Sequence, residues 1–285
     1  MSFGDFLRLI RVNQWYKNLV IFLPLIFVGH LLDVTEFVLI IIGFFSLCFI
    51  SSVNYIVNDF IDRKKDRLNP EKMDKPLVTG RVSDFQAFVV LFFFLAASIA
   101  LALLLPLMFL FAVIALFVSS QLYSLFFKHE LFLDILFIAV NFVIRAISGT
   151  FVIGVSISPW LVLCTFFLSL FLSVGKRKSE SMLLGSGASN HRKVLKYYSH
   201  DITNSLMIVA TSLLIMSYAL YTFLSNFPGL IWTLPVALYV ILRYTYLVYS
   251  GSDIARHPER FIRDVRLVSG IVLWFLLILV IIYFS

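Results

Sequence analysis

The chain has 285 residues, of which 61% are hydrophobic, 14% are charged and 31 are Phe. Soluble domains are typically about 45–50% apolar and about 25% charged, so this composition excludes an ordinary soluble domain. The net charge of +7 could indicate nucleic-acid binding, but the basic residues lie between long apolar runs. We therefore expect a membrane protein whose cations meet anionic lipid headgroups and phosphorylated substrates, with no nucleic acid among its partners.

Long apolar runs follow one another along the chain, and each is near the roughly 20 residues that cross a bilayer as an α-helix. The pattern predicts nine spans, at roughly 15–32, 36–57, 84–104, 106–126, 132–153, 158–175, 203–224, 229–249 and 267–285. Pro24 predicts a kink in the first, short span. No small-residue cleavage site follows the first apolar run, which argues against a cleavable signal peptide. We expect an all-α, polytopic membrane protein in which residues 1–285 form a single transmembrane domain.

Lys and Arg are distributed unevenly between the two ends of these spans. With nine spans, 21 of the 23 basic residues fall at the N-terminus or in the segments after spans two, four, six and eight. The other two, Arg145 and Arg243, lie inside spans. Because basic loops remain in the cytoplasm, we predict a cytoplasmic N-terminus and a C-terminus outside. The same rule puts two long charged loops, 58–83 and 176–202, in the cytoplasm, and loops of this length usually have a function.

The second predicted span ends in a dense group of carboxylates. Asp59, Asp62 and Asp66 are spaced i, i+3 and i+7, so on a helix they share one face. Carboxylates this close repel one another unless a cation lies among them. Hard oxygen ligands that share a phosphate-bearing substrate suit Mg²⁺. The alternative is a solvated helix end whose charge is offset by neighbours such as Arg63 and Lys64, but at the mouth of a membrane bundle we favour the metal site.

The fifth predicted span carries a polar stripe. Asp134, Asn141, Arg145 and Ser148 recur on one helical face, and Arg145 lies about 16 Å along the axis from Asp134. A cation that deep in a bilayer is costly and usually faces a functional cavity. The alternative is a structural pair between Arg145 and an Asp or Asn on a neighbouring helix.

Other polar residues at or within the spans are open to simpler interpretations. Lys17, Tyr123 and Lys128 lie at span ends, where lysines snorkel and aromatic residues form an interface belt. Cys48 and Cys164 fall inside spans without CxxC spacing, so we expect packing residues and no redox chemistry. The five histidines are scattered without ligand spacing, and we infer no zinc site.

Taken together, these residues resemble the UbiA-type intramembrane prenyltransferase superfamily, nearly from end to end. Asn58, Asp59, Asp62 and Asp66 match the first acidic signature of that superfamily, NDxxDxxxD. The turn Lys75-Pro76-Leu77-Val78-Thr79-Gly80-Arg81 is similar to its KRPxxxGxxS continuation. The resemblance implies a bundle of nine transmembrane helices with cytoplasmic active-site loops.

The resemblance is closer to one subgroup. Aromatic prenyltransferases of the superfamily carry a second acidic motif after span six, where this chain has Gly175-Lys176-Arg177-Lys178-Ser179-Glu180. One acid among three cations would bind an anion better than a second metal ion. The segments 11–18, 123–129 and 145–149 also resemble the polyprenyl-phosphate phosphoribosyltransferase subgroup. The chain departs from that pattern at Val12 and Phe127, where the residue carries no chemistry.

This resemblance implies transfer of 5-phosphoribose from 5-phosphoribosyl 1-diphosphate to a polyprenyl phosphate such as decaprenyl phosphate, with release of diphosphate. It implies that Asp59, Asp62 and Asp66 are catalytic and hold Mg²⁺ against the leaving group. The residues expected to contact donor or acceptor are Lys17, Asn58, Lys75, Arg81, Tyr123, Lys128, Arg145, Lys176, Arg177 and Glu180. The sequence does not divide the cations between the acceptor phosphate and the 5-phosphate.

Two other functions remain open at this point. A conventional member of the superfamily would move an isoprenyl group from its diphosphate to a quinone precursor, haem or glycerol phosphate. A transporter for an anionic solute would also account for Arg145, but it explains the three aspartates poorly and the chain has no sign of an inverted repeat. The sequence is compatible with a homo-oligomer and leaves the length of the lipid undetermined.

Overall fold

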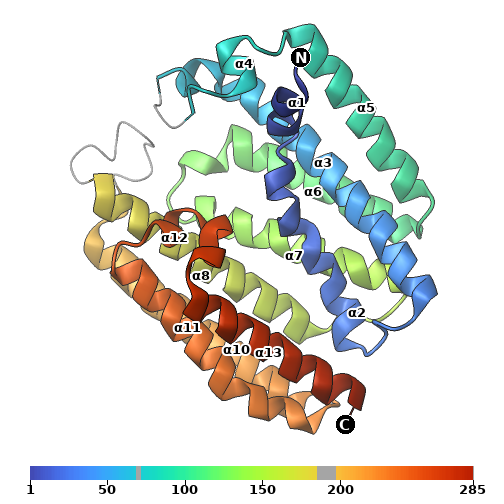
Figure 1. Cartoon of the computed structure of the whole chain (residues 1–285), viewed down its shortest axis with the longest axis vertical. Helices are drawn as coiled ribbons and strands as arrows, with labels where there is room; N and C mark the ends of the chain where they lie inside the picture. Colours follow the sequence, from blue (N-terminus) through green and yellow to red (C-terminus); the bar gives the residue numbers. More distant parts are fainter. Residues whose placement is uncertain (69–71, 185–196, 285) are drawn as a thin grey trace. The chain divides into compact units, whose positions relative to one another are not determined.

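The computed structural model describes residues 1–68, 72–184 and 197–284, and the regular secondary structure in these ranges is helical throughout, as predicted. The packing divides the chain into two compact units. Their helices are labelled along the chain in Figure 1. Unit 1 comprises Met1–Phe126 and Ile144–Ser156, and unit 2 comprises Phe127–Val143 and Ile157–Ser285. Each unit buries an apolar core of its own.

Unit 1 contains a long central helix and the segments that pack on it. Its elements are α1 (Phe3–Leu9), the 3-10 helix η1 (Val12–Phe22), α2 (Leu23–Phe27), α3 (Val34–Asp66), α4 (Pro76–Thr79), α5 (Asp84–Leu103), α6 (Leu107–Leu125) and the C-terminal part of α7 (Leu133–Ile153). Helices α3 and α5 pack closely where two buried serines meet. The hydroxyl of Ser46 donates to the carbonyl of Ser98, and that of Ser98 to the carbonyl of Ser46, each at 2.9 Å. Small residues with such mutual hydrogen bonds let two membrane helices approach closely.

The C-terminal part of α7 lies against η1 at Gly149. A Cβ atom at this position would lie 2.2 Å from the carbonyl oxygen of Ile21 and 3.1 Å from the ring of Pro24. Because real Cβ atoms do not approach backbone oxygen this closely, only glycine allows this contact. The contact keeps α7 and η1 together in unit 1.

Unit 2 is organised around α8 and α10. Its elements are η2 (Phe127–His129), the N-terminal part of α7, α8 (Pro159–Leu184), α10 (His200–Leu224), η5 (Pro228–Thr233), α11 (Leu234–Tyr249), α12 (Asp253–Arg256), η6 (Pro258–Arg263) and α13 (Val265–Phe284). The indole N–H of Trp274 donates to the Tyr218 hydroxyl at 2.8 Å, and that hydroxyl lies 2.6 Å from the Thr233 hydroxyl. Arg243, the second basic residue inside a predicted span, pairs with Asp264 at 2.6 Å.

Eight helices of the described chain are long and apolar enough to cross a membrane, and they correspond to predicted spans two to nine. The first predicted span differs, because it forms η1 and α2, which meet at Leu23 beside Pro24. The change of helix type agrees with the kink expected from proline. The count of nine spans therefore stays a prediction. Large apolar side chains such as Phe85, Phe92 and Phe93 of α5 are exposed, as a lipid-facing surface requires.

Helices α3 and α8 extend beyond the apolar spans into the segments predicted as cytoplasmic loops, and for α3 this agrees with the helix expected to carry Asp59, Asp62 and Asp66. Helix α3 continues past residue 57 to Asp66, and α8 continues past residue 175 to Leu184. Hydropathy marks the edge of the hydrocarbon region and not the end of a helix, and Lys, Arg and Glu are good helix formers. With 33 residues, α3 is about 50 Å long, whereas the hydrocarbon core is about 30 Å thick. Its charged end therefore extends beyond that core.

The remaining part of the second predicted loop is described only from residue 197 onward. Residues 185–196 lie outside the described residues, and they include the Gly/Ser-rich stretch 185–189 and the basic residues Arg192, Lys193 and Lys196.

Candidate active site

The carboxylates of Asp59 and Asp66 face the same ammonium group at the end of α3. Nζ of Lys75 lies 2.7 Å from Oδ1 of Asp59 and 2.6 Å from Oδ2 of Asp66. The side chains of Asp59 and Asp66 are only 3% and 4% exposed. Arg11 adds a second cation, with Nη2 at 2.5 Å from the same Oδ1 of Asp59, and Lys72 lies 3.7 Å from Asp66. The buried negative charge is therefore balanced by cations of the chain itself.

The local backbone explains how Lys75 comes to this position. Lys75 is the N-cap of α4, and Pro76 opens that helix with a fixed φ angle. Gly80 ends α4 in the left-handed region, at φ 76°, which glycine adopts without strain. The short helix between these two residues returns the chain toward α3, which brings Lys75 to the acidic face.

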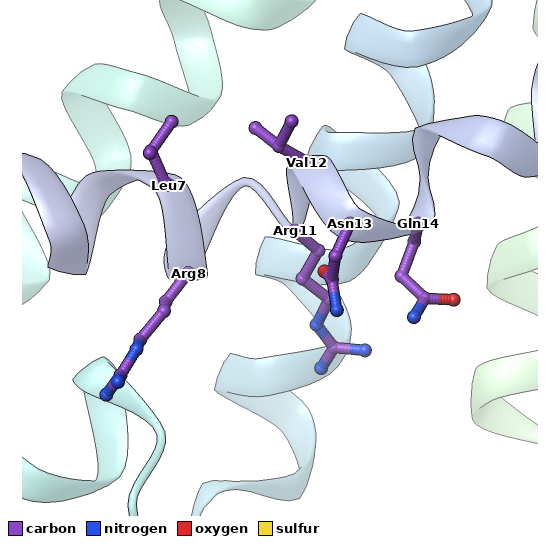
Figure 2. A pocket seen from close by; sticks show the side chains of 6 residues that line it. All are labelled: Leu7, Arg8, Arg11, Val12, Asn13 and Gln14. Atoms are coloured by element: carbon purple, nitrogen blue, oxygen red, sulfur yellow. The ribbon is translucent and has the colours of Figure 1, made fainter. Parts of the chain in front are cut away.

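Arg11 reaches the same face from the N-terminal segment. It occupies the left-handed region at φ 51°, between α1 and η1, where non-glycine residues are uncommon and often serve a site. Figure 2 shows Arg8 and Arg11 extending to one side of this segment, while Leu7 and Val12 extend to the other. The guanidinium of Arg11 also lies 4.7 Å from the ring centre of Tyr55, a cation–π contact. This part of the chain borders a hollow of about 500 Å³.

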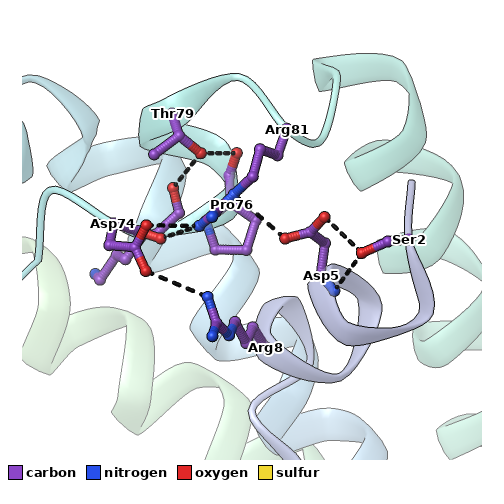
Figure 3. A network of polar contacts seen from close by, with 8 residues as sticks. Ser2, Asp5, Arg8, Asp74, Pro76, Thr79 and Arg81 are labelled. Carbon is purple, nitrogen blue, oxygen red and sulfur yellow. Dashed lines mark hydrogen bonds and ion pairs between the residues drawn. The ribbon is translucent and has the colours of Figure 1, made fainter.

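Ion pairs fasten the α4 turn to α1 (Figure 3). Arg81 contacts Asp5 at 3.3 Å and Asp74 at 3.0 Å, and Arg8 contacts Asp74 at 3.2 Å. Exposed pairs of this kind contribute only about 0–1 kcal/mol each. Arg81, which the sequence assigns to the substrate, thus takes part in a network that links the two segments carrying Arg11 and Lys75.

The donor set at the end of α3 fits a divalent cation that shares its coordination with another ligand. In the described ranges, no three His, Cys, Asp or Glu side chains gather closely enough to hold a metal ion unaided. Asp59 and Asp66 converge, while Asp62 is half-buried on the same helix. Mg²⁺ usually binds to one or two carboxylates, several waters and substrate phosphates, so two convergent aspartates are sufficient. Coordination by all three aspartates stays a prediction.

A second polar group in unit 1 surrounds Arg145. Nε of Arg145 donates to Oδ1 of the buried Asn18 at 2.8 Å. Asn18 also donates to the sulfur of Cys48 at 3.3 Å and accepts from Ser51 at 3.4 Å. The hydrogen bond between Arg145 and Asn18 of η1 is the structural pair with an Asp or Asn that the sequence analysis gave as the alternative. Arg145 is 7% exposed, so the polar stripe on α7 is buried at this position.

Three cations of unit 1 act electrostatically on one tyrosine. The tyrosine is Tyr55 of α3, and the cations that interact with its phenol are Lys17 of η1, Arg145 of α7 and Arg11.

A separate polar group lies in unit 2, around Asp134 at the start of α7. Nε of Arg177 donates to Oδ2 of Asp134 at 2.7 Å, and Nη1 of Arg177 donates to Glu180 at 2.7 Å. The hydroxyl of Tyr198 donates to Oδ1 of Asp134 at 2.5 Å. Burial and the hydrogen bond to Asp134 raise the pKa of the Tyr198 phenol. The predicted stripe residue Asp134 is thus the acceptor that orients Arg177.

Lys178 follows Arg177 but is used differently. It is fully buried, contacts the side-chain oxygen of Asn204, and lies 3.7 Å from the ring centre of Tyr249. These contacts join α8 to α10 and α11.

The predicted site residues divide between the two units. Unit 1 holds Lys17, Asn58, Asp59, Asp62, Asp66, Lys75, Arg81, Tyr123 and Arg145, and unit 2 holds Lys128, Lys176, Arg177 and Glu180. Asn58 lies on α3, Tyr123 on α6 and Lys176 on α8, all half-buried, and Lys128 lies buried in η2.

Sequence reasoning missed Arg11, Lys72, Tyr55 and Tyr198 as members of these polar groups. Arg11 opens one of the segments that matched the phosphoribosyltransferase subgroup, and this was the available signal for it. The sequence around Tyr198 carried no comparable signal, because only the folded chain brings it to Asp134.

Comparison with curated proteins finds several phosphoribosyltransferases similar to this chain. A decaprenyl-phosphate phosphoribosyltransferase of Corynebacterium glutamicum is 30% identical over 221 residues, covering 76% of this chain and 67% of that protein. The enzyme of the same name from Mycobacterium tuberculosis is 29% identical over 261 residues, covering 88% of this chain and 85% of that protein.

The fold is also known. A UbiA homolog from Archaeoglobus fulgidus, solved bound to GPP and Mg²⁺, is similar with a TM-score of 0.73 at 20% identity, covering 96% of this chain and 99% of that one. The UbiA prenyltransferase family model matches residues 19–262, which is most of the chain. The chain therefore belongs to the UbiA prenyltransferase family.

Proposed function

We propose that this protein transfers 5-phosphoribose from 5-phosphoribosyl 1-diphosphate to a polyprenyl phosphate such as decaprenyl phosphate, releasing diphosphate. The observation that carries the proposal is the similarity to decaprenyl-phosphate phosphoribosyltransferases over 76–88% of the chain. The basic end of α8 supports it, because the resemblance aligns Lys176 and Arg177 with the place where aromatic prenyltransferases carry a second acidic motif.

In this reaction the donor diphosphate binds at the end of α3. Asp59 and Asp66, with Asp62 on the same helix, would hold Mg²⁺, and Lys75 and Arg11 would contact the diphosphate oxygens. Bound there, Mg²⁺ would neutralise the charge that develops on the leaving diphosphate. The positive charge that develops on the ribose ring is stabilised by nearby carboxylates.

The acceptor needs little activation by the protein. A phosphate oxygen of the lipid is already an anionic nucleophile, so its attack on C1 requires no protein base. The bond from C1 to the diphosphate oxygen breaks as the bond from C1 to the lipid phosphate forms, and diphosphate departs with the electron pair. The candidates for positioning the acceptor phosphate and the 5-phosphate are Lys17 and Arg145 in unit 1 and Lys128, Lys176 and Arg177 in unit 2.

One assay tests this function against conventional prenyl transfer. Purified protein is incubated with decaprenyl phosphate, MgCl₂ and phosphoribosyl diphosphate labelled in the ribose, and the lipid extract is separated. We expect a labelled phosphoribosyl lipid, absent with EDTA and with Asp59→Asn. A parallel reaction offers a labelled prenyl diphosphate with 4-hydroxybenzoate or glycerol phosphate. Label transferred only in that reaction would contradict the proposal.

A further inference from the structure

We propose that Lys75 is a built-in counterion between Asp59 and Asp66 that competes with a divalent cation for these carboxylates and leaves them most readily when the cation binds together with a diphosphate. The contacts at 2.7 and 2.6 Å place one ammonium group on two carboxylates at once. The inference rests on the proposed function only in assuming that a diphosphate donor uses this site.

Lys75 and a divalent cation compete for the same carboxylates. Oδ1 of Asp59 and Oδ2 of Asp66 converge on Nζ of Lys75, and Asp59 and Asp66 are the residues that would hold the metal. Oδ1 of Asp59 also accepts a hydrogen bond from the guanidinium of Arg11. A metal ion that enters alone must therefore displace the ammonium and then lie beside three cations, Lys75, Arg11 and Lys72. Repulsion between like charges at such short range opposes this step.

A diphosphate that arrives with the metal removes that obstacle. Its anionic oxygens can accept charge-assisted hydrogen bonds from the displaced Lys75 and from Arg11, and these bonds take the place of the ion pairs with Asp59 and Asp66. Mg²⁺ itself prefers to share its coordination with substrate phosphates. Metal and diphosphate are thus expected to bind cooperatively, and each must raise the affinity of the other by the same factor.

The structure allows the ammonium to move without moving its helix. Pro76 and Gly80 define the backbone of α4, whereas the ammonium of Lys75 is at the end of a flexible four-carbon chain. The Lys75 side chain is 20% exposed, so it has an open side toward which it can turn. When diphosphate leaves after turnover, the return of Lys75 to the carboxylates favours release of the metal.

The test measures metal affinity without any donor. Mn²⁺ binding to detergent-purified protein is followed by electron paramagnetic resonance, with no diphosphate present. Lys75→Met removes the competing charge while keeping the length of the side chain, so we expect Mn²⁺ to bind roughly tenfold more tightly than to the wild type, within the range of about 5- to 150-fold typical of coupled sites. Lys75→Arg retains a cation and should remain close to the wild type. A Lys75→Met protein that binds Mn²⁺ no more tightly than the wild type would overturn the proposal.

Two controls assign the gain to this site. Lys65→Met removes an exposed lysine next to Asp66 on α3 and should leave Mn²⁺ affinity unchanged. The double variant Asp59→Asn/Lys75→Met should not show the increase in Mn²⁺ affinity, because it lacks one of the carboxylates that would bind the metal.

A measurement on the wild type covers the case in which Lys75→Met does not fold. MgCl₂ alone should raise the melting temperature little, whereas MgCl₂ with inorganic diphosphate should raise it clearly more than either compound alone. Equal shifts with MgCl₂ alone and with both compounds would contradict the counterion role. Failure of the proposed function would instead appear as no phosphoribosyl lipid, an outcome that leaves these metal affinities unaffected.

Discussion

The hydroxyl of Tyr198 donates a 2.5 Å hydrogen bond to the carboxylate of Asp134, and both side chains are almost completely buried. Tyr198 lies just before α10, so this bond fastens the segment to the start of α7. The Ser181 hydroxyl adds a second tie by donating to the carbonyl of Tyr198 at 2.9 Å. The other oxygen of Asp134 accepts a hydrogen bond from Arg177. Tyr198 therefore helps to hold Asp134 in the position from which it orients Arg177.

Replacing Tyr198 by Phe removes the hydroxyl and leaves one oxygen of a buried carboxylate without its donor. We expect the free energy of unfolding to fall by about 1–3 kcal/mol, measured by thermal or denaturant unfolding in detergent. Tyr197→Phe is the matched control, since Tyr197 is exposed and its replacement should change little. Equal stability of the two variants would show that the Tyr198–Asp134 bond is unimportant.

The same pair makes a prediction about alkaline pH. The pKa of Tyr198 is raised above its usual 10.0 by burial and by the hydrogen bond to Asp134, so folding favours the neutral phenol. This contribution to stability is complete below pH 10 and is lost as the pH rises from there toward the pKa in the folded protein. The stability difference between wild type and Tyr198→Phe should therefore shrink above about pH 10.

Gly149→Ala tests the contact between α7 and η1. The added methyl group would overlap the carbonyl oxygen of Ile21, and backbone atoms cannot move aside as a flexible side chain can. We expect a loss of about 1–3 kcal/mol in the free energy of unfolding, the usual cost of overpacking. Gly4→Ala in α1 is the control, because only Ser2, 4.0 Å away, lies near the added atom. That variant should be as stable as the wild type or slightly more stable.

The acidic face of α3 should be essential for turnover. Asp59→Asn and Asp62→Asn each remove a proposed metal ligand, and we expect activity to be abolished while the protein stays folded in detergent. EDTA should have the same effect, reversed by added MgCl₂. Asp201→Asn changes an exposed acid in the first turn of α10 and should be nearly neutral. Most activity remaining in both α3 variants would refute the assignment.

Lys176→Ala tests the basic end of α8. If Lys176 contacts a substrate phosphate, its removal costs a charge-assisted interaction worth about 1.5–3 kcal/mol. The ratio kcat/KM should then fall by about one to two orders of magnitude, with the dependence on Mg²⁺ concentration nearly unchanged. Lys65→Ala removes a lysine from the exposed side of α3 and serves as the control. A change in Mg²⁺ dependence in Lys176→Ala would indicate a role at the metal instead.

The charge asymmetry predicts which segments face the cytoplasm. Single cysteines at Met73 and Tyr197, both exposed, should resist an impermeant thiol reagent in intact cells and react in inverted vesicles. A cysteine at Ser156, in a connection without basic residues, should react in intact cells. Cys164→Ser provides the background, because Cys48 is buried. Labelling of the Met73 or Tyr197 position in intact cells would overturn the predicted orientation.

The sequence by itself determined the helical membrane class, because long apolar runs have few other stable structures in a bilayer. It also placed Asp59, Asp62 and Asp66 on one helical face, since their spacing depends only on helix geometry. It marked the ends of apolar spans near residues 57 and 175 but not the ends of α3 and α8, because hydropathy reports the extent of the hydrocarbon region and both helices continue past those residues.

Only the tertiary structure decided which charges meet. Lys75 lies 9 residues from Asp66 and 16 from Asp59, yet one ammonium serves both, because the α4 turn reverses the chain. Arg145 donates a hydrogen bond to Asn18, which is 127 residues away in the sequence, and Tyr198 donates one to Asp134, which is 64 residues away. Periodicity reports the face on which a residue lies, whereas its partner depends on how separate helices pack. For that reason the sequence located the acidic face of α3, and the fold revealed the lysine that neutralises it.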